Sequence, residues 1–214
     1  VDGRPVLFAF NGGPGTSSMM IHAGFLGAIR VKYGDVKDIG TPLPPYESCE
    51  NMQSLLGVMD ICVIDPVGTG FGRLIDPEAK DEFYGIEQDA ESMLVFVQKW
   101  LDRYGRWKSP KYLMGESYGC TRAATMAGMA SLGADRAFSM AFDGLIMIGN
   151  TVTNNQHFQA KGIMYPSVLT FPTLAAVNWY HKRPTDQSVD EFVREAKQFA
   201  DTEYLLALYR GDSL

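Results

Sequence analysis

The chain has 214 residues, and its composition of 46% hydrophobic and 21% charged side chains is typical of a globular protein and not of a disordered one. A net charge of −6, with 25 acidic against 19 basic residues, argues against a general nucleic-acid surface. No run of about 18 apolar residues occurs, so the sequence predicts no membrane span.

The first predicted strand is the continuous apolar run of residues 5–10, a pattern typical of a strand that is buried on both faces. It ends in Asn-Gly-Gly-Pro-Gly at residues 11–15, where the glycines let the backbone turn and leave N–H groups free. Three interpretations of this loop are open: an ordinary strand-to-helix turn, half of an oxyanion hole, or a phosphate-binding loop. The phosphate loop is disfavoured because no Gly-Lys-Ser/Thr follows.

Residues 16–57 are predicted to be a long irregular connection, in which the three prolines of residues 41–46 indicate a surface loop. The second buried strand covers residues 60–65 and again ends in a glycine-rich loop, residues 66–72. The Gly-x-Gly in this loop mimics part of a dinucleotide-binding fingerprint. Its third glycine is misplaced and no amphipathic helix opens directly from the loop, which argues against a nucleotide site.

An amphipathic helix is predicted from about residue 85 to residue 104, because apolar residues recur there every three or four positions. These residues are Ile86, Ala90, Met93, Leu94, Val97, Trp100, Leu101 and Tyr104. We expect the face that they form to pack against the sheet.

Residues 111–119 hold the strongest single indication of chemistry. Residues 112–114 suit a buried strand, and residues 120–131 are rich in small side chains, which lets a helix pack close to a sheet. Between them lies Gly-Glu-Ser-Tyr-Gly, a turn so sharp that it needs both glycines and lifts the Ser117 hydroxyl clear of the backbone. The motif alone turns up by chance in surface loops, but in this context it predicts that Ser117 is a catalytic nucleophile.

A fourth apolar strand is predicted at residues 144–149, and the alternation of strands and helices indicates a mostly parallel α/β sheet with helices on both faces. After Asn150 no further strand of this kind is predicted. Helices are predicted at residues 172–181, 188–199 and 204–209, the second of them opened by a capping box. We therefore expect a core at residues 1–150 and a helical insertion, or lid, at residues 151–214.

Three glycine-rich loops, at residues 11–15, 66–72 and 115–119, each follow a predicted parallel strand. They therefore meet at the same carboxyl edge of one sheet, which is where open α/β sheets bind ligands. We expect the active site at this edge.

Four motifs, in their order and at their separations, resemble those of the serine carboxypeptidase family, whose members have the α/β-hydrolase fold. The motifs are Asn11–Gly15, Asp65–Phe71, Gly115–Gly119 and Ile148–Asn150. The resemblance covers essentially the whole chain, and the helical region after residue 150 looks most like bacterial members. It implies a hydrolase that releases C-terminal amino acids from peptides through an acyl-enzyme, in a secreted or periplasmic protein. No metal and no cofactor are expected.

The resemblance also implies site residues, with Ser117 as the nucleophile, the N–H groups of Gly13 and Tyr118 as the oxyanion hole, and Asn11, Gly12 and Glu116 binding the C-terminal carboxylate of the substrate. A carboxylic acid that faces a substrate carboxylate must keep its proton, because two ionised carboxylates repel each other, so we expect activity at acid pH. If these two residues do not bind the substrate, the alternative is that Asn11 is a turn residue and that Glu116 is a carboxylate at the end of a strand, facing water.

Three positions depart from the family pattern. Phe25 stands where many members have a glutamate that pairs with the one at Glu116, which leaves selectivity for a terminal carboxylate open. Ala9 stands where an aromatic residue is common. Thr16 replaces the usual cysteine, so a family disulfide is absent.

The cysteines Cys49, Cys62 and Cys120 form an odd set without Cys-x-x-Cys spacing. This pattern argues against a zinc site and leaves the disulfide state open. No signal peptide is visible, but the first residues run straight into a strand, as in a domain entered partway through. The missing signal therefore says little about the compartment.

The catalytic acid and base are not identified by the sequence. In hydrolases of this type they follow the serine, on loops after later strands of the sheet, and no such strand is predicted here. His157 and His181 fall in the predicted insertion, and His22 lies just past the first loop, so none of the three is expected to be the base. We expect a sheet that is incomplete on its C-terminal side, with an exposed edge, and an Asp and a His supplied by a second chain or a C-terminal segment.

Three functions stay open on these grounds. A serine carboxypeptidase is favoured. Phe25 and Ala9 motivate an esterase or acyltransferase of the same fold. The missing acid and base motivate a catalytically incomplete, non-enzymatic fragment, although an intact nucleophile turn and both oxyanion loops would have no purpose in one.

Overall fold

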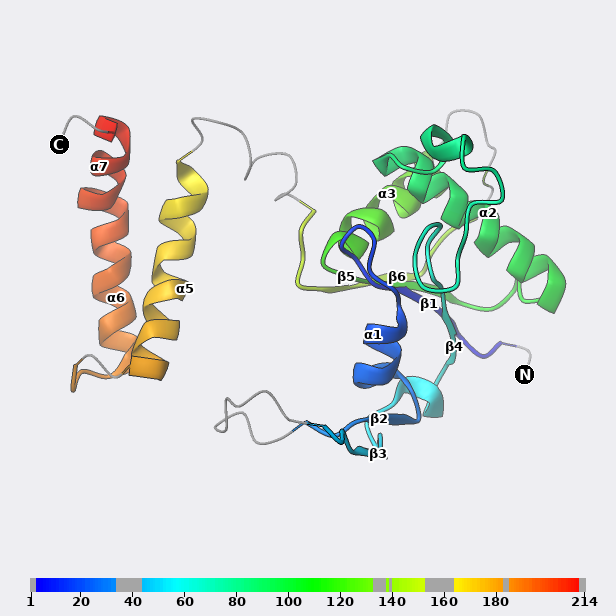
Figure 1. Ribbon diagram of the computed structural model, residues 1–214, viewed down its shortest axis with the longest axis horizontal. Coiled ribbons are helices and arrows are strands. Elements are labelled where there is room, and N and C mark those ends of the chain that lie inside the picture. Colours follow the sequence, from blue (N-terminus) through cyan, green and yellow to red (C-terminus); the bar gives the residue numbers. More distant parts are fainter. Residues whose placement is uncertain are drawn as a thin grey trace. The chain divides into compact units, whose positions relative to one another are not determined.

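The computed structural model describes residues 3–33, 44–132, 138, 140–152, 164–182 and 185–211 (Figure 1). The chain divides into two compact units, Val1–Val152 and Thr153–Leu214, and each is described here by itself. No helix in the described ranges is long and apolar enough to cross a membrane.

A four-stranded parallel sheet lies at the centre of the first unit. Its strands are β1 (Val6–Phe10), β4 (Asp60–Val63), β5 (Lys111–Glu116) and β6 (Gly144–Ile148). They are arranged in the order β4-β1-β5-β6, and every neighbouring pair is parallel. The four predicted strands and the predicted parallel sheet are therefore confirmed. All five residues of β1 are fully buried, as expected for a central strand without polar side chains.

The long helices α2 (Ile86–Tyr104) and α3 (Tyr118–Leu132) pack against one face of the sheet (Figure 1). The predicted apolar face of α2 faces the sheet, and the helix ends at Gly105, whose positive φ of 62° forms a left-handed cap. The buried cluster on this side includes Val6, Phe8, Phe10, Ala90, Met93, Leu94, Val97, Leu101, Leu113, Ala123 and Met126.

In the described part of the chain, the opposite face of the sheet is covered by short helical segments, which include α1 (Met19–Ile21) and the π-helical turn η1 (His22–Leu26). Its buried apolar residues are Leu7, Ala9, Ile21, Leu26 and Met114. Helical segments thus cover both faces, as predicted, although the cover is unequal. The last strand, β6, is an outer strand of the described sheet, with Leu145 and Met147 being 38% and 37% exposed.

The prediction of an irregular connection over residues 16–57 is wrong in part. Besides α1 and η1, this range holds a two-stranded antiparallel sheet, β2 (Ile29–Val31) with β3 (Ser48–Glu50), and a 3₁₀ turn, η2 (Leu55–Gly57). Asn51 closes this region by donating through its side chain to the carbonyl oxygen of Gly27 at 2.9 Å. Three-residue strands are too short for a hydrophobic period to indicate them.

The second unit is helical. Its elements are α5 (Tyr165–Lys182), α6 (Val189–Phe199), the π-helical turn η4 (Ala200–Tyr204) and α7 (Leu205–Arg210). The predicted capping box is present, because Ser188 accepts from the N–H of Glu191 and Glu191 accepts from the N–H of Ser188. The predicted helix start at residue 172 is wrong, since α5 begins at residue 165 and contains Pro172. A proline inside a helix removes one N–H donor, which makes such a position resemble a start.

Aromatic contacts join the helices of this unit. The Phe171 ring of α5 lies 5.4 Å from that of Phe199 and 4.9 Å from that of Tyr204, measured between ring centroids. Rings at these separations attract each other beyond the area that they bury. The helices α5 and α6 therefore form a hairpin with its own small apolar centre. Its role as a lid stays a prediction.

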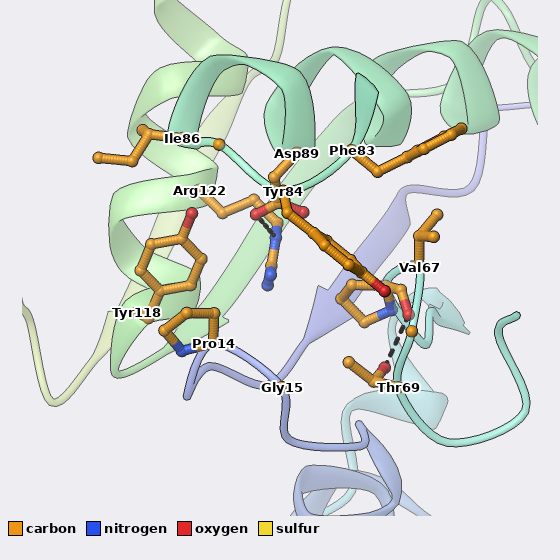
Figure 2. A pocket seen from close by; sticks show the side chains of 13 residues that line it. Pro14, Gly15, Val67, Thr69, Phe83, Tyr84, Ile86, Asp89, Tyr118 and Arg122 are labelled. Atoms are coloured by element: carbon orange, nitrogen blue, oxygen red, sulfur yellow. Dashed lines mark hydrogen bonds and ion pairs between the residues drawn. The ribbon is translucent and has the colours of Figure 1, made fainter. Parts of the chain in front are cut away.

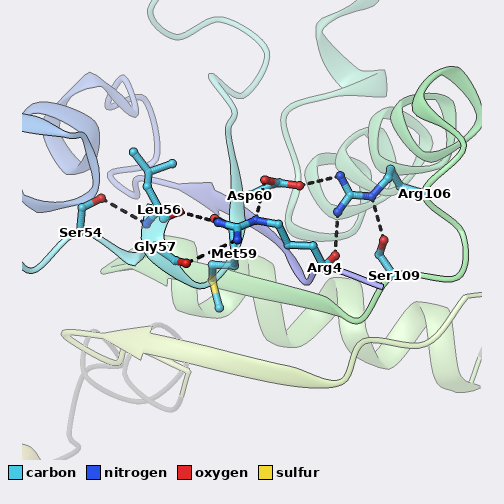
Figure 3. Close-up of polar contacts among 8 residues, drawn as sticks. All are labelled: Arg4, Ser54, Leu56, Gly57, Met59, Asp60, Arg106 and Ser109. Carbon is cyan, nitrogen blue, oxygen red and sulfur yellow. Dashed lines mark hydrogen bonds and ion pairs between the residues drawn. The ribbon is translucent and has the colours of Figure 1, made fainter. Parts of the chain in front are cut away.

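A charged network closes the amino-terminal edge of the sheet, where β1 and β4 begin (Figure 3). Asp60, the first residue of β4, accepts from Arg4 Nε at 2.9 Å and from Arg106 Nη1 at 2.6 Å. Arg106 also donates to the carbonyl oxygen of Arg4 at 2.7 Å and to Ser109 Oγ at 2.8 Å. The hydrogen bond from Arg106 holds the pKa of Asp60 below its usual range, with Arg4 adding to it and burial opposing it.

Asp60→Asn is expected to lower the free energy of unfolding at neutral pH and to make it depend less on pH in acid. Because the folded-state pKa of Asp60 is lowered, its contribution is present above the unfolded-state pKa of about 3.9 and is lost as the pH falls through the lowered value. Urea unfolding of both proteins between about pH 7 and pH 2 measures the difference. An equal acid-induced loss in the variant and the wild type would contradict the role of Asp60.

Candidate active site

Three loops converge at the carboxyl edge of the sheet. Ala9 of β1 is in register with Val63 of β4, and Phe10 is in register with Gly115 of β5. The strands therefore end side by side, and the loops that follow them begin at the same level. The predicted meeting of residues 11–15, 66–72 and 115–119 follows from this register.

Ser117 has a backbone conformation that is unusual for its residue type. Its φ is 55°, and no other non-glycine residue in the described part of the chain has a positive φ. A β-carbon at Gly115 would collide with the carbonyl group of Gly119, so glycine is required there. The N–H of Ser117 donates to the carbonyl oxygen of Ile148 at 2.9 Å, which anchors the turn to β6. Strain of this kind, held by surrounding contacts, is typical of a nucleophile turn.

The first loop lies directly against this turn at Gly12. A β-carbon added to Gly12 would lie 2.6 Å from the nitrogen of Tyr118 and 3.0 Å from the β-carbon of Ser117. Only a residue without a side chain allows the two backbones to approach so closely. The structure thus brings Gly12 together with Ser117 and Tyr118, which were predicted to share one site, and Gly13 follows Gly12 in the same loop.

The side chains of Asn11 and Glu116 are in contact. Asn11 Nδ2 donates to Glu116 Oε2 at 2.8 Å. Asn11 is 6% exposed, and its Oδ1 is buried and has no hydrogen-bond partner among the described residues. The predicted pair of substrate-binding side chains is therefore adjacent, with one acceptor still available. Phe25 lies in η1 and is 38% exposed, and its ring offers no carboxylate to pair with Glu116.

Asp65 ties the first loop to the second. Its Oδ1 accepts from the N–H of Ser18 at 2.8 Å and from Ser17 Oγ at 3.0 Å, while its Oδ2 accepts from the N–H of Phe71 at 3.0 Å. Burial alone would raise the pKa of Asp65, but the hydrogen bonds from Phe71, Ser18 and Ser17 outweigh it and the pKa is lowered. The carboxylate therefore stays ionised and holds both loops at the edge.

A buried ion pair lies behind these loops and was not predicted from the sequence. Arg122 of α3 is 2% exposed, and its Nε donates to Asp89 Oδ2 of α2 at 2.7 Å. Its Nη1 donates to the carbonyl oxygen of Asn11 at 2.8 Å. The signal that could have found the pair is weak, since each residue interrupts the apolar face of its helix with one charge.

A pocket of about 380 Å³ opens beside the first loop and Tyr118 (Figure 2). Its walls are mostly apolar or aromatic, and the charges of Asp89 and Arg122 at its lining neutralise each other. The apolar and aromatic side chains that line it are Pro14, Pro66, Val67, Phe83, Tyr84, Ile86 and Tyr118. Burial, with Asp89 adding to it, raises the pKa of Tyr118 to about 12, so its phenol is neutral at physiological pH. The pocket therefore suits an uncharged, largely apolar group.

The structure identifies no base for Ser117 among the residues that it describes. His22 lies in η1, where its side chain is close to Gly27, and His181 lies in the second unit against the ring of Tyr180. His157 lies outside the described residues. Within the same part of the chain, no group of three or more His, Cys, Asp or Glu residues is placed to hold a metal ion.

Comparisons with known proteins agree on one family. The family model for serine carboxypeptidases matches residues 1–205. Serine carboxypeptidase 24 from Arabidopsis thaliana is 29% identical over 167 residues, which cover 76% of this chain and 33% of that protein. The pheromone-processing carboxypeptidase KEX1 from Phaeosphaeria nodorum is 31% identical over 116 residues, covering 54% of this chain and 16% of that protein. These relatives come from a plant and a fungus and do not support the narrower prediction of a bacterial-type member.

One solved structure supports the same fold. It is KEX1(delta)p, a prohormone-processing carboxypeptidase from Saccharomyces cerevisiae, with a TM-score of 0.51 and 18% sequence identity, and the match covers 92% of this chain and 45% of that one. The chain spans a third or less of the length of the two curated relatives above and under half of this structure. With the family model matched over nearly its whole length, the chain belongs to the serine carboxypeptidase family, and its parallel sheet is part of an α/β-hydrolase fold.

Proposed function

We propose that this chain is part of a serine carboxypeptidase that releases C-terminal amino acids from peptides through an acyl-enzyme. The observation that carries the proposal is Ser117, held at a positive φ of 55° on a turn that packs against the glycine-rich first loop. Membership of the family supports the same chemistry. The predicted core at residues 1–150 and lid at residues 151–214 are part of this proposal.

In the proposed reaction, the Ser117 hydroxyl attacks the carbonyl carbon of the last peptide bond. The N–H groups of Gly13 and Tyr118 stabilise the oxyanion that forms, and losing one such donor costs about 3 kcal/mol. A general base takes the serine proton and passes it to the leaving amine, and water then hydrolyses the acyl-enzyme. We propose that the base and its acid partner come from a second chain or from a segment outside these 214 residues.

Asn11, Gly12 and Glu116 would bind the terminal carboxylate of the peptide. The contact between Asn11 Nδ2 and Glu116 supports this, because it places an amide and a carboxyl group side by side next to the nucleophile turn. Two ionised carboxylates in contact repel each other, so a terminal carboxylate is expected to bind beside Glu116 more readily at low pH. Activity should therefore be favoured in acid.

A second candidate is an esterase or acyltransferase, which Phe25 motivates although membership of the family favours the carboxypeptidase. The phenyl ring removes the second carboxyl group that many family members place near Glu116. A site with weaker hold on a terminal carboxylate would accept substrates that lack one.

The two candidates differ in how they treat a blocked dipeptide with a free acid, the same dipeptide as its amide, and an ester. A carboxypeptidase is expected to cleave the acid at least about tenfold faster than the amide, since hydrogen bonds to a charged group contribute about 1.5–3 kcal/mol. Equal rates on acid and amide, with a fast ester, would favour the esterase. No turnover of any of the three, together with no reaction at Ser117, would leave a non-enzymatic fragment.

The compartment follows from the same proposal. Membership of the family fits a location outside the cytoplasm, and we propose a secreted or periplasmic protein. An acidic extracellular or periplasmic setting would suit a site that binds a terminal carboxylate beside a second carboxyl group.

A further inference from the structure

An arginine holds each end of the central strand β1. Before the strand, Arg106 donates to the carbonyl oxygen of Arg4 at 2.7 Å (Figure 3). After the strand, Arg122 donates to the carbonyl oxygen of Asn11 at 2.8 Å. Both arginines also bind a carboxylate, so the two clamps are chemically alike and differ in what lies next to them.

The clamp at the carboxyl edge is the more deeply buried of the two. The Arg122 side chain is 2% exposed and that of its partner Asp89 is 13% exposed, against 13% for Arg106 and 37% for Asp60. Burying an ion pair is costly, and replacing one with apolar residues of similar volume is often neutral or stabilising. Stability alone is therefore a weak reason for a charged pair at this position, and its contacts point to another role.

Arg122 contacts both segments that carry the proposed oxyanion hole, at Asn11 and at the Tyr118 side chain. Its bond to the Asn11 carbonyl fixes the peptide that leads into Gly12 and Gly13. Its guanidinium carbon also lies 5.1 Å from the centre of the Tyr118 ring, within the range of a cation–π contact. Figure 2 shows Arg122 between Asp89 and Tyr118.

The other contacts of the Arg122 guanidinium restrict its orientation. The bond from Nε to Asp89 sets the plane of the guanidinium, and the Phe10 ring lies 5.3 Å from its central carbon. On the preceding peptide group, the N–H of Asn11 donates to the buried Ser18 Oγ at 3.0 Å, so the backbone of Asn11 is held at both its N–H and its carbonyl group. The planar guanidinium of an arginine, whose N–H donors have fixed directions, suits this position. The ammonium group of a lysine, on a flexible stem, does not.

We propose that Arg122, oriented by Asp89, is a positioning residue that sets the separation of the Gly13 and Tyr118 N–H groups. The inference rests on the proposed function of these two groups as the oxyanion hole. Arg122 itself does not touch the reacting atoms. It acts through the Asn11 carbonyl on one loop and through the Tyr118 ring on the other.

The test compares Arg122→Met, combined with Asp89→Asn so that no charge is left buried alone, with the wild-type protein purified in its native form. Because an oxyanion exists only on the reaction path, kcat on a blocked dipeptide acid is expected to fall about 10- to 100-fold while KM changes less than about threefold. The rate of fluorophosphonate labelling of Ser117 should fall in parallel. Arg122→Lys should recover only part of the loss, since one ammonium cannot reproduce the planar guanidinium.

The matched control is Arg106→Met combined with Asp60→Asn, which removes the same chemistry from the other end of β1. It is expected to lower the urea midpoint while leaving the kcat of the folded protein unchanged. Arg122→Lys alone, which keeps a positive charge beside Asp89, covers the case in which the double variant does not fold, and its kcat should fall about 3- to 10-fold.

An unchanged kcat in the folded Arg122 variants, or an equal loss in the Arg106 control, would overturn the positioning role and leave the carboxypeptidase proposal intact. A wild-type protein that neither cleaves the acid nor reacts with fluorophosphonate would overturn both.

Discussion

Ser117→Ala is expected to lower kcat on a peptide acid by about 10⁴-fold or more and to abolish fluorophosphonate labelling. The hydroxyl is the proposed nucleophile, and no neighbouring group of the turn can replace its oxygen. Kinetics with a blocked dipeptide acid, and mass spectrometry to locate the labelled residue, measure the two effects. Labelling at Ser117 in the wild type would also mean that a base lies within hydrogen-bond reach of it.

The positive φ of Ser117 allows a second measurement at this position, which is the free energy of unfolding of two variants. Alanine at a φ of 55° keeps the strain, whereas glycine relieves it, so Ser117→Gly should be about 1 kcal/mol more stable than Ser117→Ala although both are inactive. Ser131, an exposed residue of α3, is the matched control, and Ser131→Ala should retain full labelling. Persistent labelling of Ser117→Ala would show that another residue is the nucleophile.

Gly12→Ala is expected to lower kcat by about 10²- to 10³-fold and to destabilise the fold by about 1–3 kcal/mol. Gly12 does not have a positive φ, so the cost comes from contact alone. The added methyl group would meet the Tyr118 nitrogen and the Ser117 β-carbon, and it would push the first loop away from the nucleophile turn. Urea unfolding and steady-state kinetics on the same preparation separate the two effects.

Gly128→Ala is the control for this substitution. Gly128 lies in α3 with no heavy atom within 4 Å of its added β-carbon, so alanine should stabilise the helix by about 0.5–1 kcal/mol and leave kcat unchanged. Full activity in Gly12→Ala would mean that the two loops need not be in contact for catalysis.

The sheet could be predicted because its signals are local. The continuous apolar runs at β1 and β4 are sufficient for buried strands, and the spacing on α2 is sufficient for an amphipathic helix. The glycines around Ser117 indicate the turn, because the backbone conformation itself requires them. In each case a few neighbouring residues carry the information.

The features that could not be predicted from the sequence depend on contacts between residues that lie far apart along the chain. A lone arginine in a helix normally faces solvent, and Arg122 is buried only because Asp89 lies 33 positions earlier on a helix that packs beside it. The short strands β2 and β3 are similar, since each exists only through pairing with the other. The family resemblance assigned Asn11 and Glu116 to one site but did not predict the contact between them, and their roles in substrate binding stay predictions.

The burial of β1 has a consequence for how the site can fluctuate. The strand pairs on both sides and has no exposed surface, so its amide hydrogens should exchange with solvent only when the whole first unit unfolds. The bond from the Asn11 N–H to Ser18 carries this protection one residue into the first loop. Local opening therefore cannot loosen this loop at Asn11. Any breathing motion that admits a substrate or gates turnover must arise beyond it, in the exposed residues 13–15 or in the other elements around Ser117.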